Sequence, residues 1–149
     1  MYRSEALMSK DFESYLRENF GKTYFKEFKG LFGIPDYVCF SKDNNNISIV
    51  SFELKLANWK CAIIQAFRYR SFSDRTYVVL PEKTVHNALE NINMFRQYNI
   101  GLVSFTDSQF TILYRPMTQK PYNEDMRRKV VQKVRASRKK AIRTIDSIL

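Results

Sequence analysis

The alternation of apolar and polar residues along the chain predicts helices and strands in a regular order. Apolar residues recur at helical spacing over residues 4–20 and 58–71, and each stretch begins with a residue suited to capping, Ser4 and Asn58. Between these two helices the polarity alternates from one residue to the next, which is typical of strands with one buried face. The strands predicted there span residues 23–29, 34–41 and 47–56.

The second half of the chain extends this pattern. Residues 76–80 form a continuous apolar run, as expected of a strand buried on both faces. A helix over residues 84–98 follows, and then a hairpin over residues 101–114 that turns at Asp107 and Ser108. With a final C-terminal helix, the order α-β-β-β-α-β-α-β-β-α predicts an α/β fold with a mixed central sheet flanked by helices.

One predicted strand has two faces of different character. In residues 47–56, the even-numbered positions from Val50 onward are apolar and form a buried face. The opposite face begins with two isoleucines and ends with Glu53 and Lys55. A solvated Glu–Lys pair is one interpretation of that end. The isoleucines indicate a face whose start is covered and whose far end opens into a cleft.

The loop before this strand brings a second acid close to Glu53. If Asn44 and Asn45 form a two-residue hairpin loop, the register sets Asp36 opposite Glu53, with about 5 Å between their Cβ atoms. Lys55 projects from the same face, about 7 Å further along the strand. Two carboxylates this close repel each other unless a cation lies between them, and Mg²⁺ is a hard ion that binds such oxygens. The set predicts metal-assisted hydrolysis of a phosphodiester.

Three short motifs in this region resemble those of a known superfamily. Residues 33–36 (Gly-Ile-Pro-Asp) followed by residues 53–55 (Glu-Leu-Lys) resemble the signature of the PD-(D/E)XK nucleases. Gln65 and Tyr69 on the next helix match the Gln-x-x-x-Tyr pattern of its RecB-like branch. The order α-β-β-β-α-β over residues 4–81 is similar to the restriction-endonuclease-like core of that superfamily.

The resemblance implies a metal-dependent nuclease that hydrolyses DNA phosphodiester bonds through a metal-activated water, with Mg²⁺ or Mn²⁺ as cofactor. The metal ligands that it implies are Asp36, Glu53 and the carbonyl of Leu54. Lys55 would act on the attacking water. Gln65 and Tyr69 would line the site and hold the DNA backbone or the lysine, unless they are only a polar flank of a buried helix.

The superfamily often adds an acid from its first helix. Glu5, Glu13 and Glu18 are candidates for this position. Glu5 is favoured because it lies early in the helix, where that acid usually falls. For each glutamate taken separately, a solvated helix face remains the alternative.

Composition favours a polyanionic partner. The chain of 149 residues has a formal net charge of +10 and a pI of about 9.7, and nucleic acid, most often DNA, is a better match than a membrane. Arginine suits phosphate through its bidentate fork. The candidate nucleic-acid-binding residues are Lys60, Arg68, Arg70, Arg75, Arg127 and Arg128. Arg68 could instead be an outward-facing solubilising charge.

The predicted organisation is a nuclease-like domain over residues 1–119 and a basic helical extension over residues 120–149. Residues 123–149 are predicted to form an amphipathic basic helix, whose period slips near Ser137 so that it could be divided in two. This extension binds DNA non-specifically, packs on the core, or joins a homodimer or larger assembly. No apolar leader or membrane-spanning stretch is found, so we expect an intracellular protein, cytoplasmic or nucleoid-associated. A non-catalytic nucleic-acid-binding module, or an assembly subunit with a nuclease-like fold, remains the alternative function. DNA or RNA, strandedness, and endo- or exonucleolytic cutting are left open.

Overall fold

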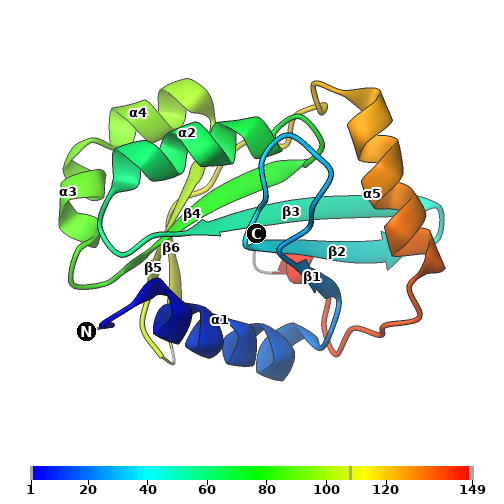
Figure 1. Ribbon diagram of the computed structural model, residues 1–149, viewed down its shortest axis with the longest axis horizontal. Helices are drawn as coiled ribbons and strands as arrows, with labels where there is room; N and C mark the ends of the chain where they lie inside the picture. Colours follow the sequence, from blue (N-terminus) through cyan, green and yellow to red (C-terminus); the bar gives the residue numbers. More distant parts are fainter. Residues whose placement is uncertain (1, 108, 148–149) are drawn as a thin grey trace.

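The computed structural model describes residues 2–107 and 109–147, which form one six-stranded sheet with helices on both faces (Figure 1). The strands are β1 (Tyr24–Lys26), β2 (Tyr37–Asp43), β3 (Asn46–Leu54), β4 (Arg75–Pro81), β5 (Gly101–Phe105) and β6 (Phe110–Tyr114). The helices are α1 (Glu5–Phe20), α2 (Trp59–Tyr69), α3 (Val85–Glu90), α4 (Ile92–Tyr98), α5 (Glu124–Ala136) and a short 3₁₀ helix, η1 (Ile145–Ser147). Within these residues, no helix is long and apolar enough to cross a membrane.

The sheet is mixed, as the order of elements predicts. Its strands lie side by side in chain order, from β1 to β6. β1, β2 and β3 are antiparallel, β3, β4 and β5 are parallel, and β6 runs antiparallel to β5. Helix α2 connects β3 to β4, and α3 with α4 connects β4 to β5. The predicted α/β class is therefore confirmed.

Two layers of side chains bury the sheet. On one face, the ring centres of Phe12 in α1 and Phe52 in β3 are 5.3 Å apart, in a cluster that extends from β2 to β5. On the other face, α2, α3 and α4 cover β4 and β5 (Figure 1). Val130 and Val134 of α5 pack against Ile49 and its neighbours on this second face. The start of the Glu53 face is thus covered, as the isoleucine pattern predicts.

The C-terminal segment packs on the core and is only partly helical. Helix α5 ends at Ala136, where the period of the sequence slips, and from Ser137 to Ser147 the predicted helix is wrong except for the 3₁₀ turn η1. The chain instead returns to the end of α1, where the Ile142 N–H donates to the Phe20 carbonyl (2.8 Å) and η1 buries Ile145. Ser108 of the predicted hairpin turn, and Ile148 and Leu149 at the end of the predicted C-terminal helix, lie outside the described residues.

Two other elements differ from the predictions for local reasons. The helix over residues 84–98 is divided at Asn91, whose side chain donates to the Asn87 carbonyl (2.8 Å) and competes with the helical backbone. Strand β1 is shorter than predicted because Glu27 has a positive φ of 52°. The Glu27 N–H then donates to the carbonyl of Asp36 (3.0 Å), which ties this loop to the start of β2.

Candidate active site

The β2–β3 hairpin has the predicted register. Asp43 pairs with Asn46 across the two-residue loop, and Tyr37 pairs with Phe52 at the other end of the hairpin. The next residue outward on β2's side is Asp36, whose Oδ2 accepts a hydrogen bond from the Leu54 N–H at 2.7 Å. The side chain of Asp36 therefore reaches the end of β3 that carries Glu53, as predicted.

Pro35 leaves the carbonyl of Leu54 without its usual partner in the ladder. Continuing the register from the Tyr37–Phe52 pair by two residues sets Pro35 opposite Leu54. The Leu54 N–H points towards Asp36, and in an extended strand the C=O of a residue points the same way as its N–H. Because proline has no N–H, β2 supplies no donor to this carbonyl. The Leu54 oxygen therefore receives no backbone hydrogen bond from Pro35.

Tyr69 of α2 holds the second carboxylate. Its hydroxyl lies 2.6 Å from Glu53 Oε1 and 3.0 Å from the Ile34 carbonyl. The hydroxyl has a single proton, so it donates to Glu53 when that acid is ionised. When Glu53 is protonated, the acid donates to Tyr69, and Tyr69 donates to Ile34. The charge of Glu53 therefore decides which of its two neighbours receives the proton of the Tyr69 hydroxyl.

Gly33 makes room for this tyrosine. A Cβ atom at Gly33 would lie 2.9 Å from Cε1 of Tyr69, and the φ of Gly33 is 80°, a conformation that favours glycine. The glycine of the Gly-Ile-Pro-Asp motif therefore allows the loop before β2 to pack directly on α2.

Burial and like charge raise the pKa of both acids. Burial, with the charge of Asp36, raises the pKa of Glu53 to about 8, although the bond from Tyr69 and the charge of Lys55 oppose this. Glu53 is only 4% exposed. Burial also raises the pKa of Asp36, with a further contribution from Glu5, against the opposing hydrogen bond from the Leu54 N–H. Burial and the neighbouring acid thus disfavour the charged form of each carboxyl group.

Glu5 is the acid of the first helix that lies beside this pair. Its Oε1 forms an ion pair with Lys55 Nζ at 3.9 Å, and its charge raises the pKa of Asp36. Glu13 is bonded elsewhere, to Tyr24 and its neighbours, and Glu18 is exposed. Of the three candidates, Glu5 is the one whose charge acts on Asp36 and Lys55.

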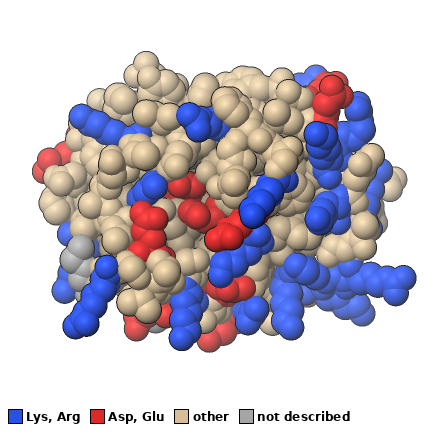
Figure 2. All heavy atoms as spheres, in the orientation of Figure 1, with Lys and Arg blue, Asp and Glu red and all other residues tan. Residues whose placement is uncertain are grey.

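Acidic and basic side chains are unevenly distributed on the molecular surface. Figure 2 shows acidic side chains gathered near the middle of one face, between α2 above and α1 below. Lysine and arginine surround the group and dominate the side of α5. A phosphate backbone attracted by the basic surface would meet negative charge at the centre unless a cation lay there.

Gln65 lies one turn before Tyr69 on α2. It is partly buried, and its Oε1 is 3.8 Å from the sulfur of Cys61. Among the described residues it makes no hydrogen bond to Asp36, Glu53 or Lys55. Its predicted role in lining the site stays a prediction.

The donor set fits a hard divalent ion. Asp36 and Glu53 each keep one carboxylate oxygen without a hydrogen-bond partner among the described residues, and the Leu54 carbonyl is a third oxygen nearby. Within residues 2–107 and 109–147, no three His, Cys, Asp or Glu side chains are grouped to hold a metal. Two carboxylates, with the remaining positions left to water and phosphate, are the arrangement that Mg²⁺ commonly uses.

The predicted nucleic-acid-binding residues divide into two groups. Lys60 and Arg68 are exposed on the outer side of α2, and Arg128 is exposed on α5 in an ion pair with Asp125 (2.9 Å). Arg70 is instead 8% exposed and donates to the Tyr98 carbonyl (2.8 Å). The other two arginines are also bound within the fold.

Arg75 and Arg127 lie far from the acid pair along the sheet. Arg75 begins β4, at the opposite end of the parallel strands from Glu53, and donates to Thr118 Oγ1 at 2.8 Å. Arg127 forms an ion pair with Asp74 at 3.1 Å and donates to the Ile47 carbonyl at 2.9 Å. These bonds anchor the C-terminal segment, a role that their sequence positions did not indicate.

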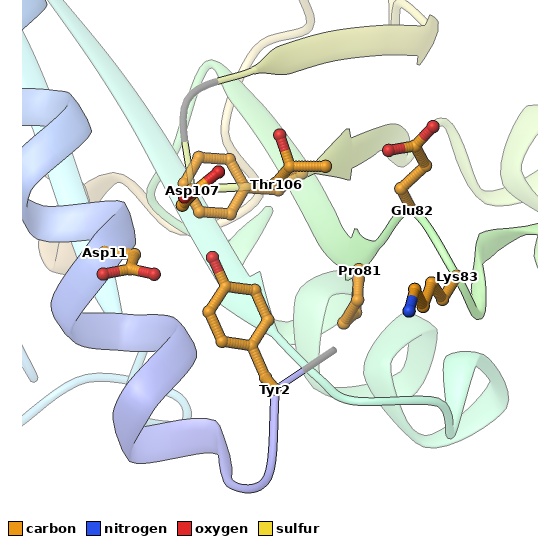
Figure 3. A pocket seen from close by; sticks show the side chains of 8 residues that line it. Tyr2, Asp11, Pro81, Glu82, Lys83, Thr106 and Asp107 are labelled. Atoms are coloured by element: carbon orange, nitrogen blue, oxygen red, sulfur yellow. The ribbon is translucent and has the colours of Figure 1, made fainter.

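A separate cavity of about 310 Å³ opens at the carboxyl ends of β4 and β5 (Figure 3). The hydroxyl of Tyr2 points into it, towards Asp11 and Asp107, and burial together with these two acids raises the pKa of Tyr2. Among the described residues that line it, none belongs to the predicted site. The sequence contained no motif for this cavity.

Comparisons with known proteins bear on the fold. The structure defines an α/β protein with a mixed six-stranded sheet, and neither a family model nor a curated protein matches the chain. Among solved structures it is similar to the SPO1766 protein of unknown function from Silicibacter pomeroyi, with a TM-score of 0.62 and 16% sequence identity. The similarity covers 91% of this chain and 86% of that one. At this identity the likeness concerns the fold alone.

Proposed function

We propose that this protein is a metal-dependent nuclease that hydrolyses DNA phosphodiester bonds at a PD-(D/E)XK-type centre on a restriction-endonuclease-like core. The observation that carries the proposal is the pair of Asp36, which is partly buried, and Glu53, which is buried, aligned in one hairpin with Lys55 beyond it. A pair of like charges with raised pKa values is costly unless it serves to bind a cation. The basic side chains around the acidic group in Figure 2, with the net charge of +10, suit a polyanionic substrate.

Asp36, Glu53 and the Leu54 carbonyl are the proposed ligands of the ion. The hydrogen bonds from Leu54 N–H and Tyr69 fix the two carboxylates through one oxygen each and leave the other to the ion. Mg²⁺ or Mn²⁺, when bound, supplies positive charge to the phosphate and lowers the pKa of water.

Lys55 provides the proposed positive group beside the reacting phosphate. Its ammonium orients the attacking water and offsets charge that develops on the phosphate oxygens. The ion pair with Glu5 holds the lysine at the edge of the site, so Glu5 acts as a positioning residue. Exposure of Lys55 is low, at 19% of its side chain, which limits the positions that its ammonium can adopt.

Glu53 would give up its proton to hold a cation. With a pKa of about 8, it is mostly protonated at neutral pH in the absence of a cation. Affinity of Glu53 for a cation would therefore rise with pH. Tyr69 then donates to the ionised carboxylate rather than to Ile34.

The test is cleavage of end-labelled single- and double-stranded DNA in Mg²⁺ or Mn²⁺. We expect Asp36→Asn and Glu53→Gln each to lower the cleavage rate about 10²-fold or more, because each removes a ligand needed in the transition state. Glu13→Gln is the matched control, since Glu13 also accepts a bond from a tyrosine but lies outside the site.

Two outcomes would count against the proposal. Cleavage that survives in Asp36→Asn or Glu53→Gln would remove the site assignment. Tight, salt-dependent DNA binding by the wild type, without turnover in either ion, would favour a non-catalytic binding module.

A further inference from the structure

An apolar groove of about 540 Å³ lies on the outer side of α2. Its apolar lining residues are Phe32, Ile63, Ile64, Phe67, Met94 and Tyr98. Phe32, Ile64 and Phe67 expose 51%, 59% and 37% of their surface. Single exposed apolar residues are common, but a group of them in one hollow marks a binding surface.

The loop before β2 connects this groove to the acid pair. Phe32 lies four residues before Asp36, so the two are no more than about 14 Å apart along an extended chain. Between them, Gly33 packs on Tyr69 and the Ile34 carbonyl is bonded to the Tyr69 hydroxyl. A single short segment therefore carries one wall of the groove and one proposed ligand of the ion.

The charged residues of the groove are both basic. Lys60 and Arg68 line it, and the guanidinium of Arg68 lies 5.5 Å from the centre of the Phe32 ring. Among the described residues that line the groove, none is acidic. A flat apolar group joined to a negative charge matches this combination of aromatic rings and cations.

A nucleotide is such a group. Bases stack on aromatic side chains, and their phosphates pair with neighbouring lysine and arginine. Bases inside a duplex are stacked on one another and cannot enter a groove of this kind unless they leave the stack. A second copy of this chain would instead bring a further positive charge, since each copy carries +10. Charge complementarity therefore favours a nucleic acid strand over self-association.

We infer that the groove binds an unpaired nucleobase of the strand whose backbone crosses the Asp36–Glu53 pair, so that the substrate contains a single-stranded segment. The identity of that strand as the one to be cut rests on the proposed nuclease function. Phe32 supplies the stacking surface, and Lys60 and Arg68 contact the adjacent phosphates.

Binding is measured by fluorescence anisotropy in EDTA, with a labelled oligothymidylate and a blunt duplex of equal length. We expect the wild type to bind the single strand more tightly. Phe32→Ala should weaken single-strand binding at least about fivefold, because one base loses its stacking partner. It should leave duplex binding within about twofold, because phosphate contacts remain.

Two further variants separate stacking from folding. Phe32→Tyr keeps an aromatic ring and should restore single-strand affinity. Leu89→Ala, which truncates a side chain 45% exposed outside the groove, should leave both affinities unchanged. Circular dichroism of each variant reports whether the fold is retained.

The inference is overturned if Phe32→Ala leaves the affinity for the single strand unchanged, or if it lowers the affinities for the single strand and the duplex equally. It is also overturned if sedimentation shows a dimer that Phe32→Ala dissociates, since a second copy would then occupy the groove. Cleavage in Mg²⁺ is measured separately. If the protein cleaves DNA but Phe32→Ala does not change single-strand binding, the role of the groove is rejected and the nuclease function is kept. If Phe32→Ala weakens single-strand binding but the protein never cleaves, the nuclease function is rejected and the role of the groove is kept.

Discussion

Two tyrosine–glutamate hydrogen bonds in this protein have opposite electrostatic surroundings. In the first, Tyr24 donates to Glu13 of α1 at 2.5 Å, and Arg17 and Lys26 each lie 3.3 Å from the same carboxylate. Burial raises the pKa of Glu13, but the hydrogen bonds from Tyr24 and Lys26 and the charges of Lys26 and Arg17 outweigh it, and the net pKa is lowered.

In the second, Tyr69 donates to Glu53 at 2.6 Å, and the charge that affects the pKa of Glu53 most is that of another acid, Asp36. Burial and Asp36 raise the pKa of Glu53 to about 8, and the charge of Lys55 is too weak to reverse this. The same kind of hydrogen bond thus accompanies Glu13, whose charge is balanced by cations, and Glu53, whose charged form is disfavoured by burial and by Asp36.

The difference separates an acid whose charge stabilises the fold from one whose charge opposes it. Glu13 joins α1 to β1 through Tyr24 and Lys26. At Glu53, burial and the charge of Asp36 outweigh the bond from Tyr69 and the charge of Lys55, so ionisation of this acid costs stability. Removing each carboxylate should therefore have effects of opposite sign.

The largest expected effect on stability is at Glu53. In EDTA at pH 9, Glu53→Gln should raise the free energy of unfolding by about 2–4 kcal/mol, because it removes a buried negative charge. Glu13→Gln should lower it by about 1–2 kcal/mol, because it removes an acceptor of charged hydrogen bonds. Urea denaturation of both variants measures the comparison, and a loss of stability in both would contradict it.

The pH dependence of this effect follows from the sign of the shift. The pKa of Glu53 is about 8 in the folded protein and near its ordinary value of 4.5 when unfolded, so the folded state holds the extra proton between these limits. Its contribution to stability is fully present below pH 4.5 and is lost as the pH rises to about 8. The gain from Glu53→Gln should accordingly vanish near pH 4.5.

A smaller effect is expected from the tyrosines. Tyr69→Phe removes a hydrogen bond that lowers the pKa of Glu53, so this pKa should rise by about one further unit. Tyr24→Phe should also raise the pKa of Glu13, while Lys26 and Arg17 still hold it in the acidic range. Carboxyl ¹³C NMR titration reports both values. An unchanged or lowered pKa of Glu53 in Tyr69→Phe would show that the bond has another role.

Local patterns were sufficient to predict the hairpin that carries the acids. The two asparagines of the loop determine the register, and the period of two in β3 assigns Glu53 and Lys55 to one face. Glu5 is favoured by the resemblance alone, which implies an acid early in the first helix, and its ion pair with Lys55 is a finding of the structure. The hairpin itself needed only short-range rules of strand pairing.

Long-range contacts could not be predicted in the same way. Arg70 and Arg127 have the sequence context of exposed cations, yet their partners lie 28 and 53 residues away. The groove beside α2 likewise joins Phe32 to Met94. Such partners are brought together by the packing of whole elements, which no local spacing rule describes.

A crystal soaked with Mn²⁺ at about pH 8.5 tests the central claim most directly. The account predicts an anomalous difference peak about 2.0–2.6 Å from one oxygen each of Asp36 and Glu53, with the Leu54 carbonyl at a similar distance. No peak should occur at Glu13, whose charge is already compensated. Well-ordered Asp36 and Glu53 side chains with no Mn²⁺ between them, or an ion at Glu13 instead, would contradict the proposed metal centre.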